Sequence, residues 1–220
     1  MTQSKTAIIF GATGLIGSYV LKELLQDNRY SKIILLTRKY LHSANPKVTE
    51  ILTGFEKKES FEDYIHGDEI YCCLGTTIRV AGTQEAFRKV DYDLPVMIGT
   101  AAKKNGVPVM LVVSSLGADA TSSNFYLRTK GEMEQSIRSL GIPHVHIFRP
   151  SMLLGPRDES RPAEAAGKFL MSTLSFLFVG GLKKYKAIHA HTVAKAMIRV
   201  ANNNMPSDTY ESLEIASIGK

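Results

Sequence analysis

Short, uninterrupted apolar runs alternate with longer amphipathic stretches along most of this chain. Runs such as IILL, within residues 32–37, and MLVV, within residues 109–115, suit strands that are covered on both faces. Strands that alternate with helices in this way form β-α-β units, in which the strands are parallel. The sequence therefore predicts an α/β fold built on a doubly wound parallel sheet.

The pattern also predicts where the individual elements lie. The expected strands are residues 6–10, 32–37, 48–52, 69–74, 109–115 and 144–149. The expected helices are residues 14–27, 60–66, 83–105 and 124–140, followed after Pro150 by an apolar helix at 163–178, a last helix at 191–203 and a candidate strand at 210–215. A length of 220 residues suits one domain, so we expect a single domain over 1–220. Residues from about 151 to 220 are too few to build a core alone, and we expect them to form a small cap on the sheet.

Composition and charge indicate which kinds of ligand or partner this chain can bind. The net charge of +6 comes from scattered basic residues without a long basic run, which disfavours nucleic acid and leaves an attraction for a phosphorylated ligand. The start MTQSK is polar and lacks a secretory pattern. The apolar run from Phe169 is shorter than the roughly 20 residues that span a bilayer. We therefore expect a cytoplasmic protein without stable membrane insertion; a protein partner and the oligomeric state stay open.

Cysteines and histidines give no sign of a metal site. Cys72 and Cys73 are neighbours on an expected strand, where they point to opposite faces, so no structural disulfide is expected. The pairs His144/His146 and His189/His191 share faces, but no cysteine or carboxylate cluster accompanies them. Structural histidines are the favoured interpretation.

A glycine-rich turn follows the first strand, in the run IIFGATGLIGSYV. Its glycines follow a G-x-x-G-x-x-G spacing between a strand and a helix, the context expected of a dinucleotide-binding turn. Gly11 allows the tight turn, and Gly14 lets backbone N–H groups approach a pyrophosphate at the positive end of the helix. Gly17 lets the helix pack closely on the strand.

The end of the second strand predicts which dinucleotide binds. An NAD-preferring site expects a carboxylate roughly 20 residues after the glycines, to bind the ribose hydroxyls. This chain has Thr37 there, followed by Arg38 and Lys39. Because a guanidinium can hold a 2′-phosphate that a carboxylate would repel, we expect NADP(H) to be preferred over NAD(H). The alternative is that both cations are solvated loop charges.

Further polar residues end the fourth and fifth strands. Ligands of such folds lie outside the carboxyl ends of the strands. In the segment LGTT, Leu74 and Gly75 would let the cofactor pass closely, while Thr76 and Thr77 offer hydrogen bonds. The fifth strand ends in Ser114 and Ser115, and strand register decides which of the two faces the cofactor.

A tyrosine and a lysine stand four residues apart in NFYLRTKG, at Tyr126 and Lys130. On a helix this spacing places both on one face, although the short pattern alone is weak. A lysine cation one turn away favours the phenolate, and it can also bind the nicotinamide ribose. A serine hydroxyl can polarise a carbonyl that develops negative charge during hydride transfer. We therefore expect the three groups to form a proton-transfer set beside the nicotinamide end of a cofactor held by the glycine turn.

Four longer segments carry a family resemblance: FGATGLIG, CCLGTT, SSLGADATSSNFYLRTKGEME and FRPSMLLGPRDESRP. Together they resemble the atypical branch of the short-chain dehydrogenase/reductase superfamily that contains the eukaryotic Tat-interacting oxidoreductases. The resemblance implies a Rossmann fold, NADP(H) binding and a Ser/Tyr/Lys set, here Ser115, Tyr126 and Lys130, with Ser114 as a competitor. It further implies cofactor contacts at Thr13, Gly14, Leu15, Ile16, Arg38, Lys39, Leu74, Gly75, Leu153 and Arg161.

The function expected from these residues is an NADP(H)-dependent oxidoreductase that acts on a carbonyl or alcohol of a small molecule. Tyr126 would transfer the proton, Lys130 would tune it and Ser115 would orient the carbonyl. Two alternatives stay open. One is a regulator that senses NADPH and signals to a protein partner, and the other is an isomerase or epimerase that recycles its bound cofactor.

Overall fold

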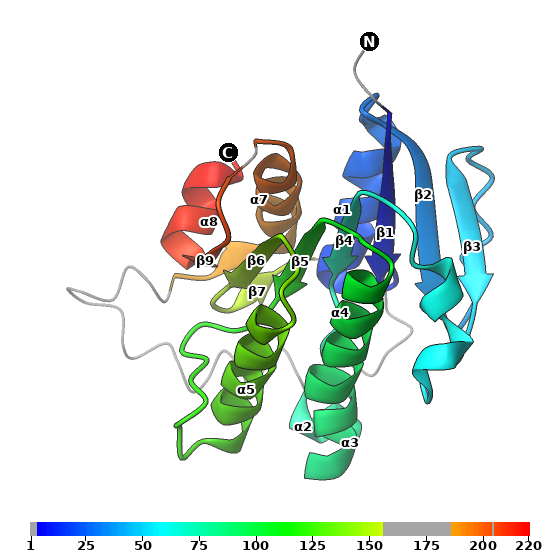
Figure 1. The fold of residues 1–220 in the computed structure, drawn as a ribbon. Coiled ribbons are helices and arrows are strands. Elements are labelled where there is room, and N and C mark those ends of the chain that lie inside the picture. Colours follow the sequence, from blue (N-terminus) through cyan, green and yellow to red (C-terminus); the bar gives the residue numbers. More distant parts are fainter. Residues whose placement is uncertain (1–3, 156–185, 204) are drawn as a thin grey trace.

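The computed structural model describes residues 4–155, 186–203 and 205–220, and it contains a seven-stranded parallel sheet. The strand order is β3-β2-β1-β4-β5-β6-β9, so the chain winds outward in both directions from β1 (Figure 1). The strands are β1 (Lys5–Phe10), β2 (Tyr30–Thr37), β3 (Val48–Leu52), β4 (Glu69–Cys72), β5 (Val109–Val113), β6 (His144–Arg149) and β9 (Asp208–Glu211). The predicted doubly wound Rossmann sheet is confirmed.

Helices cover both faces of this sheet (Figure 1). They are α1 (Leu15–Gln26), α2 (Ile78–Ala81), α3 (Gln84–Arg88), α4 (Leu94–Lys104), α5 (Phe125–Ser139), α7 (Ala190–Asn202) and α8 (Ser212–Ile218). A π-helical turn, η3 (Lys89–Asp93), joins α3 to α4. Two short strands, β7 (Leu153–Leu154) and β8 (Ile188–His189), form a separate parallel pair.

Alternating side chains on the strands divide the core into two layers. Ile9 faces the layer that contains α1 and α7, whereas its neighbours Ile8 and Phe10 face the layer that contains α4 and α5. Both layers are fully buried, which explains why the strands read as continuous apolar runs rather than as alternating ones. Because both faces of the sheet are covered by apolar side chains, polar functional groups are expected at the strand ends.

Several expected elements differ from the observed ones. Residues 60–66 form two 3₁₀ turns, η1 (Lys58–Ser60) and η2 (Glu62–Tyr64), in place of the expected helix. The expected strand at 210–215 stops at Glu211, because the side chains of Glu211 and Glu214 form a capping box that starts α8. The expected helix at 163–178 and the apolar run from Phe169 lie outside the described residues.

Part of the described C-terminal region belongs to the main sheet and its helical layers. Strand β9 pairs in parallel with β6 at the edge of the sheet, and α7 packs against α1. The apolar side chains of α7, such as Val193 and Met197, belong to the same buried layer as those of α1. Within the expected cap region, residues 186–203 and 205–220 therefore contribute one strand to the sheet and one helix to the α1/α7 layer.

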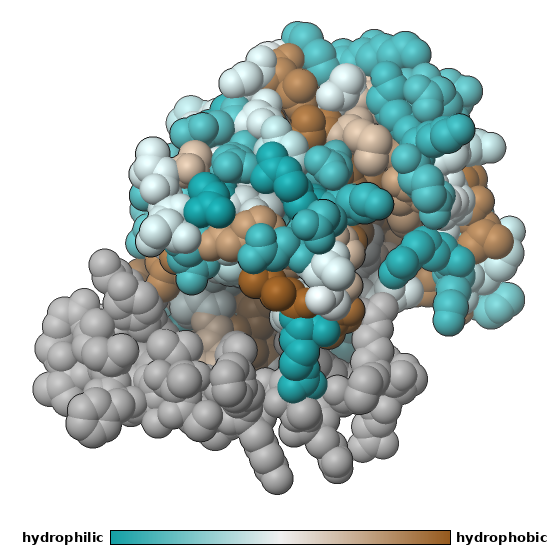
Figure 2. Space-filling view, turned by 90° about the horizontal axis from the view of Figure 1, so that it is seen from below, coloured by the Kyte–Doolittle hydropathy of each residue, from teal (hydrophilic) through white to brown (hydrophobic). Residues whose placement is uncertain are grey.

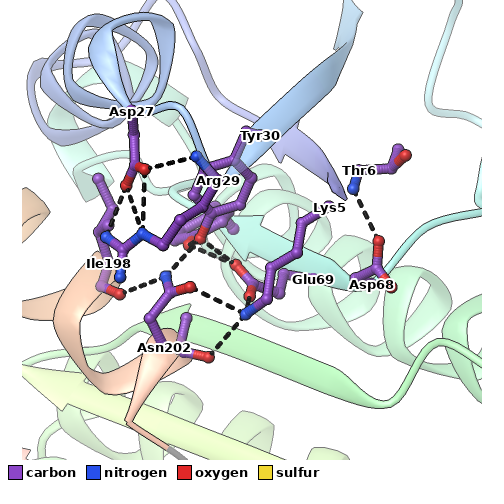
Figure 3. Close-up of polar contacts among 11 residues, drawn as sticks. Lys5, Thr6, Asp27, Arg29, Tyr30, Asp68, Glu69, Ile198 and Asn202 are labelled. Atoms are coloured by element: carbon purple, nitrogen blue, oxygen red, sulfur yellow. Dashed lines mark hydrogen bonds and ion pairs between the residues drawn. The ribbon is translucent and has the colours of Figure 1, made fainter. Parts of the chain in front are cut away.

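A buried polar cluster joins this C-terminal part to the amino ends of three strands (Figure 3). The fully buried carboxylate of Glu69 accepts hydrogen bonds from the hydroxyls of Tyr30, at 2.6 Å, and Tyr71, at 2.7 Å. Its other oxygen pairs with Lys5 Nζ at 2.5 Å. Lys5 Nζ also donates to the side chain of Asn202 at 2.9 Å, at the end of α7. Burial, chiefly, and Glu69 raise the pKa of Tyr71 well above its usual value, so this phenol stays a proton donor.

We predict that Glu69→Gln destabilises the fold by about 3–5 kcal/mol, because it removes a buried carboxylate on which the half-buried Lys5 ammonium and two buried tyrosine hydroxyls depend. Urea denaturation measures this loss. The matched control is Glu132→Gln, which removes a more exposed ion pair with Arg88 and should cost about 1 kcal/mol or less. Equal losses in the two variants would contradict a special contribution from the buried cluster.

Candidate active site

The glycine-rich turn lies where β1 and β4 end. Gly11 has a φ of +81°, and a Cβ there would stand 2.8 Å from the carbonyl oxygen of Cys73. A Cβ on Gly17 would stand 2.1 Å from the carbonyl oxygen of Gly11. Side chains at these positions are therefore excluded by backbone atoms, and the predicted roles of Gly11 in the turn and Gly17 in close packing match the geometry.

The amino end of α1 fits a dinucleotide pyrophosphate. Its N-cap residue is Gly14, and within the described residues no side chain caps this helix. The first-turn N–H groups of a helix lack intrahelical partners, so they are available to an anion. Thr13 is exposed beside this turn, whereas the side chain of Ile16 is buried in the core. A cofactor contact at Ile16 is thus limited to its backbone. The side chain of Leu15 packs against Gly155, where an added Cβ would stand 2.9 Å from Leu15 Cδ1.

The end of β2 presents the predicted adenosine-side residues. Thr37 is buried, and within the described part of the chain its hydroxyl has no hydrogen-bond partner. Arg38 and Lys39 follow directly and are both exposed. The two exposed cations at this strand end could contact an anionic part of a bound dinucleotide. Together with the glycine turn, these residues fit an NAD(P) cofactor.

The segment after β4 is tied to the helix that follows it. The Thr76 N–H donates to Asp91 Oδ2 at 2.9 Å, and the Thr77 hydroxyl accepts from the Val80 N–H at 3.2 Å. The hydroxyl of Thr77 thus caps α2, while Gly75 stays exposed and Leu74 packs against the α4/α5 layer. Gly75 and Thr76 lie just beyond the carboxyl end of β4, and their contact with a cofactor stays a prediction.

Helix α5 carries both Tyr126 and Lys130 near its amino end, where the Asn124 side chain accepts a hydrogen bond from the Leu127 N–H at 3.2 Å. Tyr126 is half-buried, with its ring 5.5 Å from that of Phe87. Lys130 is buried, and its Nζ lies 2.6 Å from Asp91 Oδ1. Burial lowers the pKa of Lys130, but the attraction of Asp91 and Tyr126 outweighs it, so the pKa is raised overall. Lys130 is therefore a cation within electrostatic reach of Tyr126.

The two serines after β5 have different surroundings. Ser114 is buried, and its hydroxyl donates to Glu134 Oε1 at 2.5 Å. Ser115 is half-buried, and its hydroxyl makes a long bond of 3.5 Å to the carbonyl of Leu116. The hydroxyl of Ser114 is thus committed to α5, whereas that of Ser115 is held weakly. This difference favours Ser115 for contact with a ligand.

Three further residues shape the site without having been expected from the sequence. Glu134 binds Arg149 through two hydrogen bonds from Nε and one from Nη2, which join α5 to the end of β6. Gly131 has no room for a Cβ, which would stand 2.1 Å from the Ala120 nitrogen, so the loop after β5 packs tightly on α5. Asp91 is the third, and its sequence signal was a carboxylate four residues after Phe87 and three before Leu94, on the apolar helix face.

The remaining candidate residues from the sequence are two cofactor contacts and the histidines. Leu153 is half-buried in β7 and packs against the α1/α7 layer, and Arg161 lies outside the described residues. His146 is buried, and burial lowers its pKa to about 4, whereas the His191 ring pairs with Glu23 at 2.8 Å. Within residues 4–155, 186–203 and 205–220, no cluster of three metal-ligating side chains occurs.

Figure 2 looks onto the molecule from below in Figure 1, and apolar side chains reach the surface in the middle of this view. Ile78 and Val80 of α2 and Leu154 of β7 are exposed apolar residues near the strand ends that carry the site. In the same described ranges, the helices are too short or too polar to cross a membrane.

Comparisons with known proteins agree with this geometry. A family model described as NAD(P)H-binding matches residues 11–204. Protein HTATIP2 of Rattus norvegicus is 34% identical over 99% of this chain and 90% of that protein. Protein FMP52, mitochondrial, of Candida albicans is 34% identical over 96% of this chain and 93% of that protein.

Solved structures share the fold at low identity. The Bordetella bronchiseptica enzyme WbmH in complex with NAD+ gives a TM-score of 0.71 at 16% identity, over 95% of this chain and 75% of that one. A UDP-N-acetylglucosamine 4-epimerase from Methanobrevibacter ruminantium gives 0.69 at 17%, over 95% and 77%. This chain therefore belongs to the NAD(P)H-binding family of Rossmann-fold proteins, with HTATIP2 and FMP52 among its relatives.

Proposed function

We propose that this protein is an NADP(H)-dependent oxidoreductase of the short-chain dehydrogenase type, acting on a carbonyl or alcohol of a small molecule. The observation that carries the proposal is the position of Lys130, a buried cation one helical turn from Tyr126. The nearby Gly75 lies at the end of β4, and a Cβ on it would stand 4.0 Å from Lys130 Nζ. This arrangement supports proton transfer next to a bound dinucleotide.

In the proposed reduction, a dinucleotide held by the glycine turn would supply the hydride that the carbonyl carbon accepts. The Tyr126 hydroxyl gives its proton to the carbonyl oxygen, which leaves a phenolate that the Lys130 ammonium stabilises. The weakly bonded hydroxyl of Ser115 donates a hydrogen bond to the same oxygen as negative charge develops there. Solvent returns the proton to Tyr126, and the reverse sequence describes alcohol oxidation.

The preference for NADP(H) rests on the exposed Arg38 beside Thr37, and it belongs to the same proposal. The cytoplasmic location stays a prediction, since the name of the Candida albicans relative assigns that protein to mitochondria.

We predict that Arg38→Ala weakens NADPH binding by roughly 10- to 100-fold and leaves NADH binding unchanged, because the guanidinium contacts the phosphate that NADH lacks. Calorimetric titration of the purified protein with each cofactor measures both affinities. Lys32→Ala is the matched control, since it removes an exposed cation nearer the opposite end of β2 and should change neither affinity. Equal weakening of both cofactors by Arg38→Ala would contradict the proposed phosphate contact.

We predict that Tyr126→Phe retains cofactor affinity and lowers turnover by about 10²- to 10⁴-fold, because it removes one hydroxyl and no packing. NADPH consumption with a panel of small aldehydes and ketones measures turnover. Tyr64→Phe, an exposed tyrosine on η2, serves as the control. Full activity in Tyr126→Phe would refute the role of this hydroxyl, and tight NADPH binding without turnover in the unmodified protein would instead support the regulator.

A further inference from the structure

Asp91 lies at an unusual place in the helical layer. It belongs to η3, a single π-helical turn that interrupts the helical stretch from Gln84 to Lys104. Such turns are rare in proteins, and a large share of those that occur lie at functional sites. The Asp91 side chain is 1% exposed, although carboxylates are seldom fully buried unless paired. The π turn thus places the Asp91 carboxylate in a buried position, which aspartate rarely occupies.

The Asp91 carboxylate joins two parts of the proposed site. Oδ1 pairs with Lys130 Nζ at 2.6 Å, and Oδ2 accepts the Thr76 N–H at 2.9 Å. A Cβ added to Gly75 would stand 3.6 Å from Oδ1 and 4.0 Å from Lys130 Nζ. The ion pair therefore lies directly beside Gly75, at the strand end where the glycine leaves space.

Few groups near Lys130 other than Asp91 stabilise its ammonium form. Its side chain is 4% exposed, and burial is the largest influence against the ammonium form. The titratable groups that face it are Asp91 from η3, Tyr126 from α5 and Cys72 from β4. Burial raises the pKa of the Cys72 thiol to about 12, so Cys72 is uncharged near neutral pH. Asp91 is thus the carboxylate that offsets the burial of Lys130.

The two carboxylates of α5 itself are paired with other cations. Glu132 pairs with Arg88 of α3, and Glu134 pairs with Arg149 of β6.

We propose that Asp91 is the positioning residue of Lys130, keeping its ammonium charged and fixed beside Gly75 so that the charge is available to Tyr126. The inference rests on the proposed function, in which Lys130 stabilises the Tyr126 phenolate. It adds a residue that touches neither substrate nor cofactor in that scheme and acts through Lys130. Without the carboxylate, burial would dominate, and Lys130 would lose its proton at a lower pH.

The test is a titration of Lys130 itself, which needs neither substrate nor turnover. The full chain, labelled with ¹³C and ¹⁵N lysine, is followed by NMR across pH, and the Lys130 signal is assigned by its loss in Lys130→Met. In the unmodified protein the signal should stay in the charged position to about pH 10 or above. In Asp91→Asn, the titration midpoint should fall by about 2–4 pH units, as burial alone does to a lysine. An unchanged midpoint in Asp91→Asn overturns the inference.

The matched control is Asp93→Asn, which removes a carboxylate two residues away in the same turn, outside the ion pair with Lys130. Its Lys130 titration should match that of the unmodified protein; a fall as large as that in Asp91→Asn would overturn the specific role of Asp91. Where turnover is measurable, Asp91→Asn should lose it as pH rises through the lowered Lys130 midpoint, and Asp93→Asn should not. A shifted midpoint in a protein without turnover would support the Asp91 contact while refuting the proposed function, so the two failures differ.

A second variant covers the case in which Asp91→Asn does not fold. The double variant Asp91→Asn/Lys130→Met removes both charges, and it keeps a side-chain oxygen for the Thr76 N–H. Because neutral replacement of a buried pair is often tolerated, we expect the double variant to recover a cooperative unfolding transition. If it stays as unfolded as Asp91→Asn, the uncompensated Lys130 charge is not the cause, and the inference is overturned.

Discussion

Helices cover both faces of a sheet whose seven strands all run in parallel, and this arrangement favours charged groups at the strand ends. A charge placed in either apolar layer would lose its hydration without gaining partners. At strand ends, by contrast, backbone groups and loop residues provide those partners. The buried carboxylates Glu69, Asp91 and Glu134 follow this rule, since each binds groups at or just beyond the end of a strand.

The two edges of the sheet use buried charge differently. At the amino edge, Glu69 is surrounded by Lys5, Tyr30 and Tyr71, and the cluster is closed by the end of α7 (Figure 3). Those contacts link elements that are distant in sequence, so their effect is on stability. At the carboxyl edge, charged and hydroxyl groups border exposed backbone at Gly75 and the uncapped start of α1. A ligand can therefore contact backbone and side-chain groups at this edge.

Local patterns in the sequence were enough to predict the sheet, the glycine turn and the helix that carries Tyr126, because each depends on neighbouring residues. Contacts between distant elements were not predictable in that way. The choice between Ser114 and Ser115 depends on Glu134, which lies on another element, and the partner of Lys130 depends on a π turn that shifts the helical register. The pairing of β9 with β6 was not predicted either, because it joins segments about 60 residues apart and depends on no local pattern.

The Asp91–Lys130 pair also bears on whether this protein turns over a substrate or only binds a cofactor. A buried ion pair contributes little net stability, since desolvation offsets the attraction, and apolar side chains often pack as well. Helix α5 already joins its neighbours through the buried Met133 and Ile137 and through a hydrogen bond between Tyr92 and Ser136. The glycine turn can hold a dinucleotide pyrophosphate without this pair, whereas a lysine cation beside Tyr126 can bind the nicotinamide ribose as well as stabilise the phenolate. The pair supplies the fixed cation that the proposed proton transfer requires, and measured turnover separates this role from binding of the cofactor ribose.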